Sequence, residues 1–117
     1  MADYGVAVTW GDAKQGREKK GLELWADSIT INEKAVADGR IASWDAVVFE
    51  ASATPPAGAT RYYGTQEQIE EFIRSEDFQD TIGRATLLLH NVSIRRFLTG
   101  AALAEEFSRY TKLVDSL

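Results

Sequence analysis

Hydrophobic and polar positions alternate near the start of the chain and then change their period. From Tyr4 to Trp10, large side chains recur at every second position, which is typical of a strand with one buried face. From about Arg17 to Asp38, apolar residues recur at steps of three and four residues, which predicts a helix. Gly39 supplies the usual stop after that helix.

The predicted helix at 17–38 carries two apolar stripes. We expect the wider stripe to face the core, and its members are Leu22, Trp25, Ala26, Ile29, Val36 and Ala37. A thinner stripe on roughly the opposite side holds Leu24, Ile31 and Ala35. Because a surface helix rarely needs two apolar sides, the second stripe indicates cover from another segment or from a second subunit.

The middle of the chain predicts two further strands and a capped helix. Residues 41–50 alternate as a strand does, and 51–59 form an irregular connection because Pro55 and Pro56 cannot sit in a central strand. Residues 60–64 form a short strand. Thr65 then caps a helix, and Gln68 completes a capping box. The buried face of that helix consists of Ile69, Phe72 and Ile73.

The last part of the chain predicts a helical turn or two, a strand and a final helix. Residues 75–82 present Phe78 and Ile82 as a short helical segment, and 86–97 form the fourth strand. A terminal amphipathic helix follows, which we expect to pack on the domain or on its partner. The apolar stripe of this helix consists of Leu103, Phe107, Tyr110, Val114 and Leu117.

The predicted element order is β-α-β-β-α-β-α, in one domain over residues 1–117. Two crossover connections joined by a hairpin-like link give a ferredoxin-like α+β fold with an extra C-terminal helix. Its four-stranded antiparallel sheet has helices on one face only. We expect the other face to be too apolar to stay in water, and therefore predict a homodimer.

Three features together resemble a known group of proteins. They are the run Val8-Thr9-Trp10-Gly11, the helix start Gly16-Arg17-Glu18, and the strand at 41–50. This pattern resembles small bacterial proteins of the dimeric α+β barrel superfamily, over nearly the whole chain. The resemblance implies two ferredoxin-like sheets paired across a subunit interface. The superfamily includes cofactor-free monooxygenases, stress-response proteins, lactone isomerases and haem-handling enzymes, so the fold leaves function open.

The composition of the chain limits which kinds of partner and chemistry are expected. The 117 residues carry a net charge of -5, so nucleic acid is not an expected partner. The sequence has no cysteine, which excludes disulfides, thiolate metal sites and cysteine nucleophiles. We expect neither a signal peptide nor a membrane-spanning helix, and a cytoplasmic location. No cofactor is predicted.

The glycine-bracketed loop at 11–18 is similar in spacing to a phosphate-binding loop. That motif needs a lysine followed by a hydroxyl residue, and the chain has Arg17 and Glu18 there. A carboxylate at the second position repels phosphate. We therefore interpret the loop as a strand-to-helix turn and expect no nucleotide binding or hydrolysis.

The candidate site residues are one histidine, several aromatics and an arginine. His90 is the only histidine; read as a strand residue, it is a candidate catalytic base, or else simply a packed side chain. Trp10, Trp44 and Tyr63 suit an apolar ligand pocket but equally a core or interface. Arg61 is a candidate ligand-binding residue, because its guanidinium group can bind a carboxylate or a phosphate. Arg95 and Arg96 cannot line one pocket together, because neighbouring strand residues face opposite ways.

Three classes of function fit these residues. The first is a homodimer that binds a small, partly aromatic or apolar ligand in a cavity touched by Trp10, Tyr63 and His90. The second is a cofactor-free monooxygenase or isomerase in which His90 acts as base. The third is a dimer with no small-molecule chemistry. A cavity with converging polar groups favours the first two classes, and a packed, pocketless domain favours the third.

Overall fold

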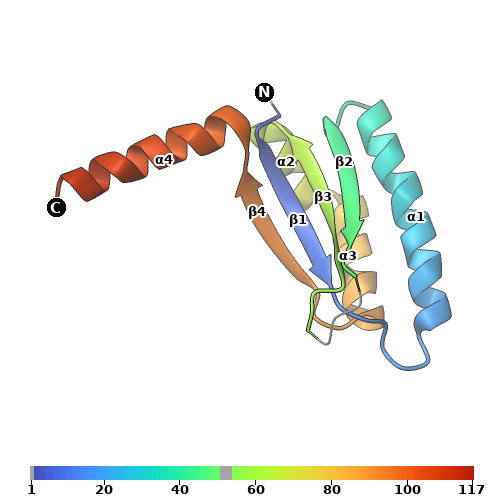
Figure 1. The fold of residues 1–117 in the computed structure, drawn as a ribbon. Coiled ribbons are helices and arrows are strands. Elements are labelled where there is room, and N and C mark those ends of the chain that lie inside the picture. The colour runs from blue at the N-terminus through green and yellow to red at the C-terminus, as the bar shows by residue number, and fades with distance from the viewer. Residues whose placement is uncertain (1, 51–53) are drawn as a thin grey trace.

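The computed structural model describes residues 2–50 and 54–117 and has an α+β architecture (Figure 1). Four strands form one sheet, and helices lie against one of its faces. The elements in chain order are β1 Tyr4–Trp10, α1 Glu18–Ala37, β2 Ser43–Val48, β3 Gly58–Gly64, α2 Gln66–Arg74, α3 Glu76–Leu88, β4 Ser93–Leu98 and α4 Gly100–Asp115.

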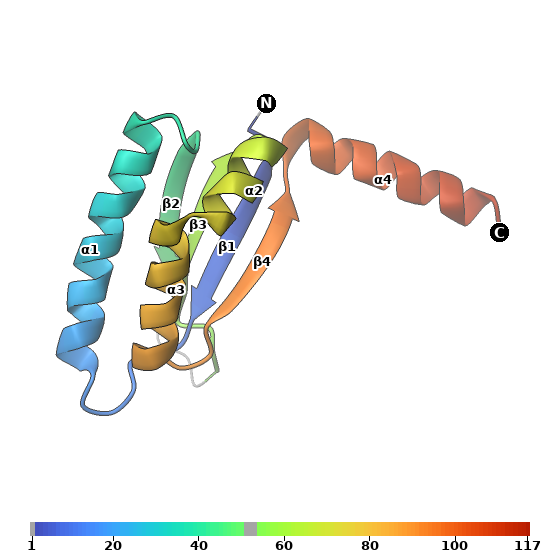
Figure 2. The same ribbon diagram turned by 180° about the vertical axis from the view of Figure 1, so that it is seen from behind.

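The sheet confirms the predicted ferredoxin-like topology. Its strands lie in the order β2-β3-β1-β4, and all neighbouring strands are antiparallel. One crossover joins β1 to β2 through α1, and the other joins β3 to β4 through α2 and α3. Figure 2 shows α1, α2 and α3 on the same side of the sheet. The predicted connection at 51–59 lies partly outside the described residues, and β3 already begins at Gly58.

The start of α2 confirms the predicted capping box. The Thr65 hydroxyl accepts a hydrogen bond from the Gln68 backbone at 3.1 Å, and the Thr65 backbone N–H donates to the Gln68 side chain at 2.8 Å. Both otherwise unpaired N–H groups are thereby satisfied, which fixes where the helix begins.

The predicted buried face of α1 is right only in part, since Val36 packs at the core and Trp25 lines a cavity beside the sheet. The residues of α1 that are buried are Leu24, Ser28, Asn32 and Ala35, whereas Leu22 of the wider stripe is 71% exposed. Two polar residues belong to the covered face, and apolar periodicity could not identify them. The Ser28 hydroxyl is accommodated because it donates to the Trp25 carbonyl at 2.8 Å. The thinner stripe is therefore covered by the chain's own sheet.

The predicted start of the fourth strand is also wrong. Leu87 and Leu88 end α3, and β4 begins only at Ser93. Ser75 caps α3 by accepting from the Phe78 backbone at 3.3 Å, and the helix then runs for 13 residues. Leucine is among the strongest helix formers, so a leucine run that continues a helix is easily mistaken for a buried strand.

The core lies between the sheet and the helices, nearest to α2. Phe72 and Phe78 are each 2% exposed, and their ring centroids are 5.3 Å apart. Tyr62 of β3 packs its ring 4.9 Å from that of Phe72. Val6, Ile41 and Ile69 complete this cluster. Tilted and edge-on ring contacts of this kind add to the free energy gained by burial.

The opposite face of the sheet is open but more polar than predicted. Its central row crosses all four strands through Asp45, Arg61, Ala7 and Arg95, which are paired neighbours in the strand register. The row beside it carries Tyr63 and Phe97, with ring centroids 5.4 Å apart. The expectation of an apolar face is therefore met only near one end of the sheet.

The terminal helix α4 forms as predicted but projects away from the body of the chain (Figures 1 and 2). Its apolar stripe is exposed, with Phe107 at 63% and Tyr110 at 61%. The predicted packing of this helix on its own domain is therefore not observed. Within the described residues, no helix is both long enough and apolar enough to cross a membrane.

Candidate functional site

A cavity of about 530 Å³ lies between the sheet and the helices, at the end of β1 and the start of α1. Its walls come from β1, β3, α1, α3 and the loop after β1. The main apolar lining residues are Val8, Trp10, Leu22, Leu24, Trp25, Ile82, Ala85 and Leu89. This volume is within the range of pockets that hold small organic molecules.

Two indole rings dominate the cavity wall. Trp10 at the end of β1 and Trp25 of α1 have ring centroids 5.9 Å apart and a tilt of 49°. Gly58, which pairs with Trp10 across the strands, makes room for the indole: a Cβ there would lie 2.8 Å from the Trp10 ring. The chain thus uses a glycine on β3 to let a large aromatic side chain lie across the sheet.

Small residues keep the space open between these rings and α3. Gly21 of α1, Ala13 of the preceding loop, Ala57 and Ala85 all line the cavity. A Cβ at Gly21 would meet Leu89 at 3.6 Å and Ala13 at 3.9 Å, which are ordinary contact distances. Larger side chains at these positions would fill the space, as they do around Phe72.

A few polar groups lie at the inner end of the cavity. Ser28, Thr60 and Tyr62 line it and are buried. Burial raises the pKa of the Tyr62 phenol to about 12, and the neighbouring Asn32 side chain acts in the opposite direction. The Asn32 Nδ2 atom is itself buried without a hydrogen-bond partner among the described residues. These groups can orient a ligand that carries one polar atom.

The charged residues that line the cavity are both acidic. Asp12 and Glu18 belong to the loop after β1 and to the first turn of α1. Among the described residues lining the cavity, none is lysine or arginine. Lys14 directs its ammonium group to the Thr86 carbonyl at 2.9 Å. The cavity therefore offers no cation for an anionic ligand.

His90 does not lie on a strand, so its predicted place in the fourth strand is wrong. It follows α3 in an exposed bend, where its backbone N–H donates to Asp12 at 2.9 Å and its carbonyl accepts from Gly11 at 2.7 Å. It lines a second hollow of about 480 Å³ that adjoins the cavity, sharing Asp12 and Val48 with it. In the part of the chain that the structure describes, no three acidic or histidine side chains gather as a metal site.

Tyr63 and Arg61 lie on the open face of the sheet, away from the cavity. Arg61 donates to both Asp45 oxygens, at 2.8 and 3.0 Å, and the Tyr63 hydroxyl donates to the same carboxylate at 3.3 Å. The bond to Asp45 raises the pKa of Arg61, and partial burial followed by the Asp45 charge raises that of Tyr63. The prediction that Trp10, Tyr63 and His90 share one cavity is wrong. Neighbouring strand residues face opposite sides, so Tyr62 lines the cavity while Tyr63 lies on the open face, and His90 lies in the bend after α3.

Trp44 lies on the helix side of β2 but not at the cavity. It pairs with Tyr62 across the strands and packs at the margin of the core cluster. The residues that sequence reasoning missed are Trp25, which it assigned to the core, and Asp12 and Gly21. The signal for Gly21 was an unexplained glycine inside a helical pattern, which often marks a packing or functional constraint.

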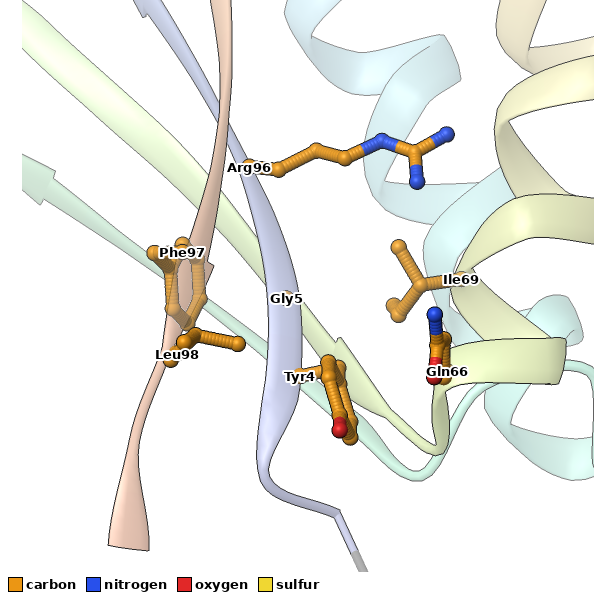
Figure 3. Close-up of a pocket in the computed structure, with 7 residues that line it drawn as sticks. All are labelled: Tyr4, Gly5, Gln66, Ile69, Arg96, Phe97 and Leu98. Atoms are coloured by element: carbon orange, nitrogen blue, oxygen red, sulfur yellow. The ribbon is translucent and has the colours of Figure 1, made fainter. Parts of the chain in front are cut away.

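A smaller hollow of about 230 Å³ lies at the other end of the sheet, beside α2 (Figure 3). Arg96 and Ile69 lie on the helix side of the sheet, and Phe97 lies on the other side. Arg96 reaches Glu70 at 3.6 Å, which is a solvent-exposed ion pair of small energetic value. This hollow is less than half the size of the cavity at Trp10.

The comparisons with known proteins show the fold alone. Neither the protein-family models nor the curated proteins include a match to this chain. A dimeric ferredoxin-like protein of unknown function from Bacteroides fragilis has a similar structure, with a TM-score of 0.61 and 6% identity, over 84% of this chain and 97% of that one.

Two other solved structures are similar to the same degree. A protein of unknown function from Bacteroides thetaiotaomicron, described as a possible oxidoreductase, has a TM-score of 0.58 and 11% identity, over 84% of this chain and 99% of that one. A Pseudomonas aeruginosa protein has a TM-score of 0.59 and 17% identity, over 86% of this chain and 97% of that one. The ferredoxin-like fold is thereby established for this chain.

Proposed function

We propose that this chain is a homodimer that binds a small, largely apolar, ring-bearing molecule in the cavity between the sheet, α1 and α3. The observation that carries the proposal is the cavity itself, a partly open space of about 530 Å³ beside the Trp10 and Trp25 indoles. Indole rings offer a large apolar surface at a small cost in conformational entropy, so they favour flat, aromatic ligands.

The charges around the cavity narrow the ligand further. Asp12 and Glu18 line it, and the described lining includes no basic side chain. An anionic ligand would lose its hydration and gain no counter-ion, which is costly in an apolar site. The ligand is therefore neutral or cationic, with one polar atom for Ser28, Thr60 or Tyr62.

The proposal of a homodimer rests on two surfaces that the chain leaves uncovered. One is the end of the open sheet face that carries Tyr63 and Phe97, and the other is the α4 stripe. The B. fragilis protein of similar fold is described as dimeric. Cyclic twofold dimers are the commonest assemblies of proteins this small.

Isothermal titration calorimetry with three ligands of nearly equal size tests the cavity. They are 2-naphthylmethanol, 2-naphthylmethylamine and 2-naphthoate, which are neutral, cationic and anionic. We expect dissociation constants of about 10–100 μM for the alcohol and the amine, a contribution of roughly 0.5 kcal/mol per heavy atom. The carboxylate should bind at least about tenfold more weakly, because it finds no cation. Equal binding of all three, or none, contradicts the proposal.

A matched pair of tryptophan variants locates the binding site. Trp10→Leu removes an indole from the cavity wall, whereas Trp44→Leu removes one from the same side of the sheet that does not line the cavity. We expect the first variant to lose 2-naphthylmethanol binding and the second to keep it. The reverse result would place the ligand at β2 instead.

His90 supports a second candidate function, that of a cofactor-free oxidising enzyme. Its imidazole lines the hollow that adjoins the cavity, where a base could remove a phenolic proton from a bound ring. The test is oxidation of 1,4-dihydroxynaphthalene, in which the diol gives the quinone and O₂ becomes hydrogen peroxide. His90→Gln should abolish any rate above that in buffer while 2-naphthylmethanol still binds. An unchanged rate would exclude His90 as the base.

A further inference from the structure

The helix α4 presents an apolar stripe to solvent along its whole length. The large apolar residues are all at least 40% exposed, and they are Leu103, Phe107, Tyr110, Leu113, Val114 and Leu117. Isolated helices of this length are marginally stable in water, and most helices are held by packing of their apolar face. An exposed stripe of this size marks an interaction surface.

The connection to β4 prevents α4 from folding back onto its own sheet. A single extended residue, Thr99, separates β4 from α4, and its N–H donates to the Asp3 carbonyl at 2.8 Å. Gly100 follows with φ +55°, and a Cβ there would lie 2.7 Å from the Asp3 carboxylate. The helix is therefore fixed at its start and leaves the body beyond the β4 edge (Figure 1).

The stripe alone is too small for a stable interface. Specific interfaces use about 20–30 residues on each side, whereas α4 and the two residues after it offer six large apolar ones. The same chain has a second uncovered surface, the open sheet face with Tyr63 and Phe97 near its α4 end. In a twofold dimer each copy can offer both surfaces to the other. The α4 stripe and the open sheet face of both copies are then covered in one closed arrangement.

The charges on the two surfaces are complementary. The central row of the open face holds one carboxylate, Asp45, and two guanidinium groups, Arg61 and Arg95. The helix α4 holds three carboxylates and two cations. The sheet row thus carries a net charge of +1 (two cations, one carboxylate) and α4 a net charge of -1 (two cations, three carboxylates), so the two surfaces are opposite in sign.

We infer that α4 is an exchanged arm: the stripe of each copy packs across the open sheet face of a second copy of this chain. This inference rests on the homodimer in the proposed function and names the segment that holds it together. It does not depend on the cavity, whose lining residues lie on the helix-covered side of the sheet. A chain without the arm would therefore be a monomer that still binds 2-naphthylmethanol.

Two neighbouring positions on α4 give a matched test by analytical ultracentrifugation. Phe107→Glu places a charge in the stripe, and Ser108→Glu places the same charge about 100° away around the helix. We expect the unaltered chain and the Ser108→Glu variant to sediment as dimers at 10 μM. Phe107→Glu should raise the dimer dissociation constant at least about a hundredfold, since an unpaired carboxylate is buried at the interface.

The outcomes separate this inference from the proposed function. If the unaltered chain is a monomer of 12.9 kDa, both the arm and the homodimer are refuted. If Phe107→Glu and Ser108→Glu are equally dimeric, the arm is refuted while the homodimer stands. If the unaltered chain is a dimer that does not bind 2-naphthylmethanol, the proposed ligand site is refuted and the inference about α4 stands.

Photo-crosslinking shows which molecule the arm contacts. Phe107→p-benzoylphenylalanine keeps an aromatic ring in the stripe, and irradiation should link it to a second chain, with the linked peptide mapping to β1, β3 or β4. The same substitution at Ser108 should give little linked dimer. Crosslinks confined within one chain would mean that α4 folds onto its own domain, which would overturn the inference.

Discussion

The layer between the sheet and the helices has two ends that differ in packing. At the α2 end, Phe72, Phe78 and Tyr62 fill the space with ring contacts of 4.9–6.0 Å. At the other end, the same sheet and the same helix α1, together with α3, line a partly open cavity of about 530 Å³ beside Trp10 and Trp25. One helix therefore spans a close-packed region and a cavity.

Small residues at the cavity end account for part of this difference. The packed end has large apolar residues where strand and helix meet, and it has a helix start fixed by the Thr65 capping box. At the cavity end, the residues between the sheet and the helices include the small side chains of Gly21, Ala57 and Ala85. Since cores normally pack to high density, space left by small residues indicates that something other than stability set their size.

The largest expected effect contrasts the two ends directly. Phe72→Ala should lower the free energy of unfolding by about 3–5 kcal/mol, because a buried ring is lost and a cavity is left. Leu22→Ala, at the rim of the existing cavity, should change it by no more than about 0.5 kcal/mol. Urea denaturation followed by circular dichroism measures both. Similar losses in the two variants would mean that the cavity end is packed as tightly as the other.

Tyr62 joins the two ends, since it contacts Phe72 and also lines the cavity. Its pKa is raised to about 12 by burial, so the folded state holds the proton above pH 10, where the unfolded chain releases it. The stabilisation is fully present below pH 10 and is lost between pH 10 and 12. The total loss should be roughly 2–3 kcal/mol, at 1.36 kcal/mol per pH unit.

Absorbance at 295 nm should show one tyrosine titrating near pH 12, and Tyr62→Phe should remove that step. In the same variant, the unfolding free energy should become less dependent on pH between 10 and 12. A phenol at Tyr62 that ionises near pH 10 would show that water enters the cavity freely and reaches this ring.

The fold could be read from the sequence because its signals are local. The alternation from Tyr4 to Trp10, the stop at Gly39 and the capping box at Thr65 each depend on residues a few positions apart. Two of the errors arose where local signals were ambiguous. The leucines ending α3 fit a strand or a helix, and the covered face of α1 includes Asn32, whose burial depends on the sheet beneath it.

The candidate site was far less predictable, because its members are brought together only by tertiary contacts. Trp10 lines the cavity and stays a prediction as a ligand-binding residue, whereas the other indole, Trp25, comes from α1 and reads as ordinary core. Tyr63 was misplaced because an aromatic pair, Tyr62 and Tyr63, gives no sign of which ring faces the helices. Which of these two rings lies on the same side of the sheet as Trp10 depends on the strand register, and the sequence does not show that register.

The smallest expected effect is the sharpest test of why the cavity end stays open. Gly21 and Gly83 both lie inside helices, where glycine costs about 0.5–1 kcal/mol relative to alanine. A methyl group at Gly83 would meet nothing within 4 Å, whereas one at Gly21 would lie on the cavity wall against Leu89 and Ala13. Gly83→Ala should therefore gain about 0.5–1 kcal/mol, and Gly21→Ala should gain at least as much, because its methyl group is also partly buried.

The two alanine variants should differ in ligand binding although both are more stable. Gly21→Ala narrows the cavity, so 2-naphthylmethanol should bind up to about tenfold more weakly, the lower end of the effect of one methylene group in an apolar pocket. Gly83→Ala should bind it as the unaltered chain does. Calorimetry on the pair checks this without the risk of unfolding. If both variants bind equally well, the ligand does not touch the wall at Gly21, and the small residues there do not serve to keep room for it.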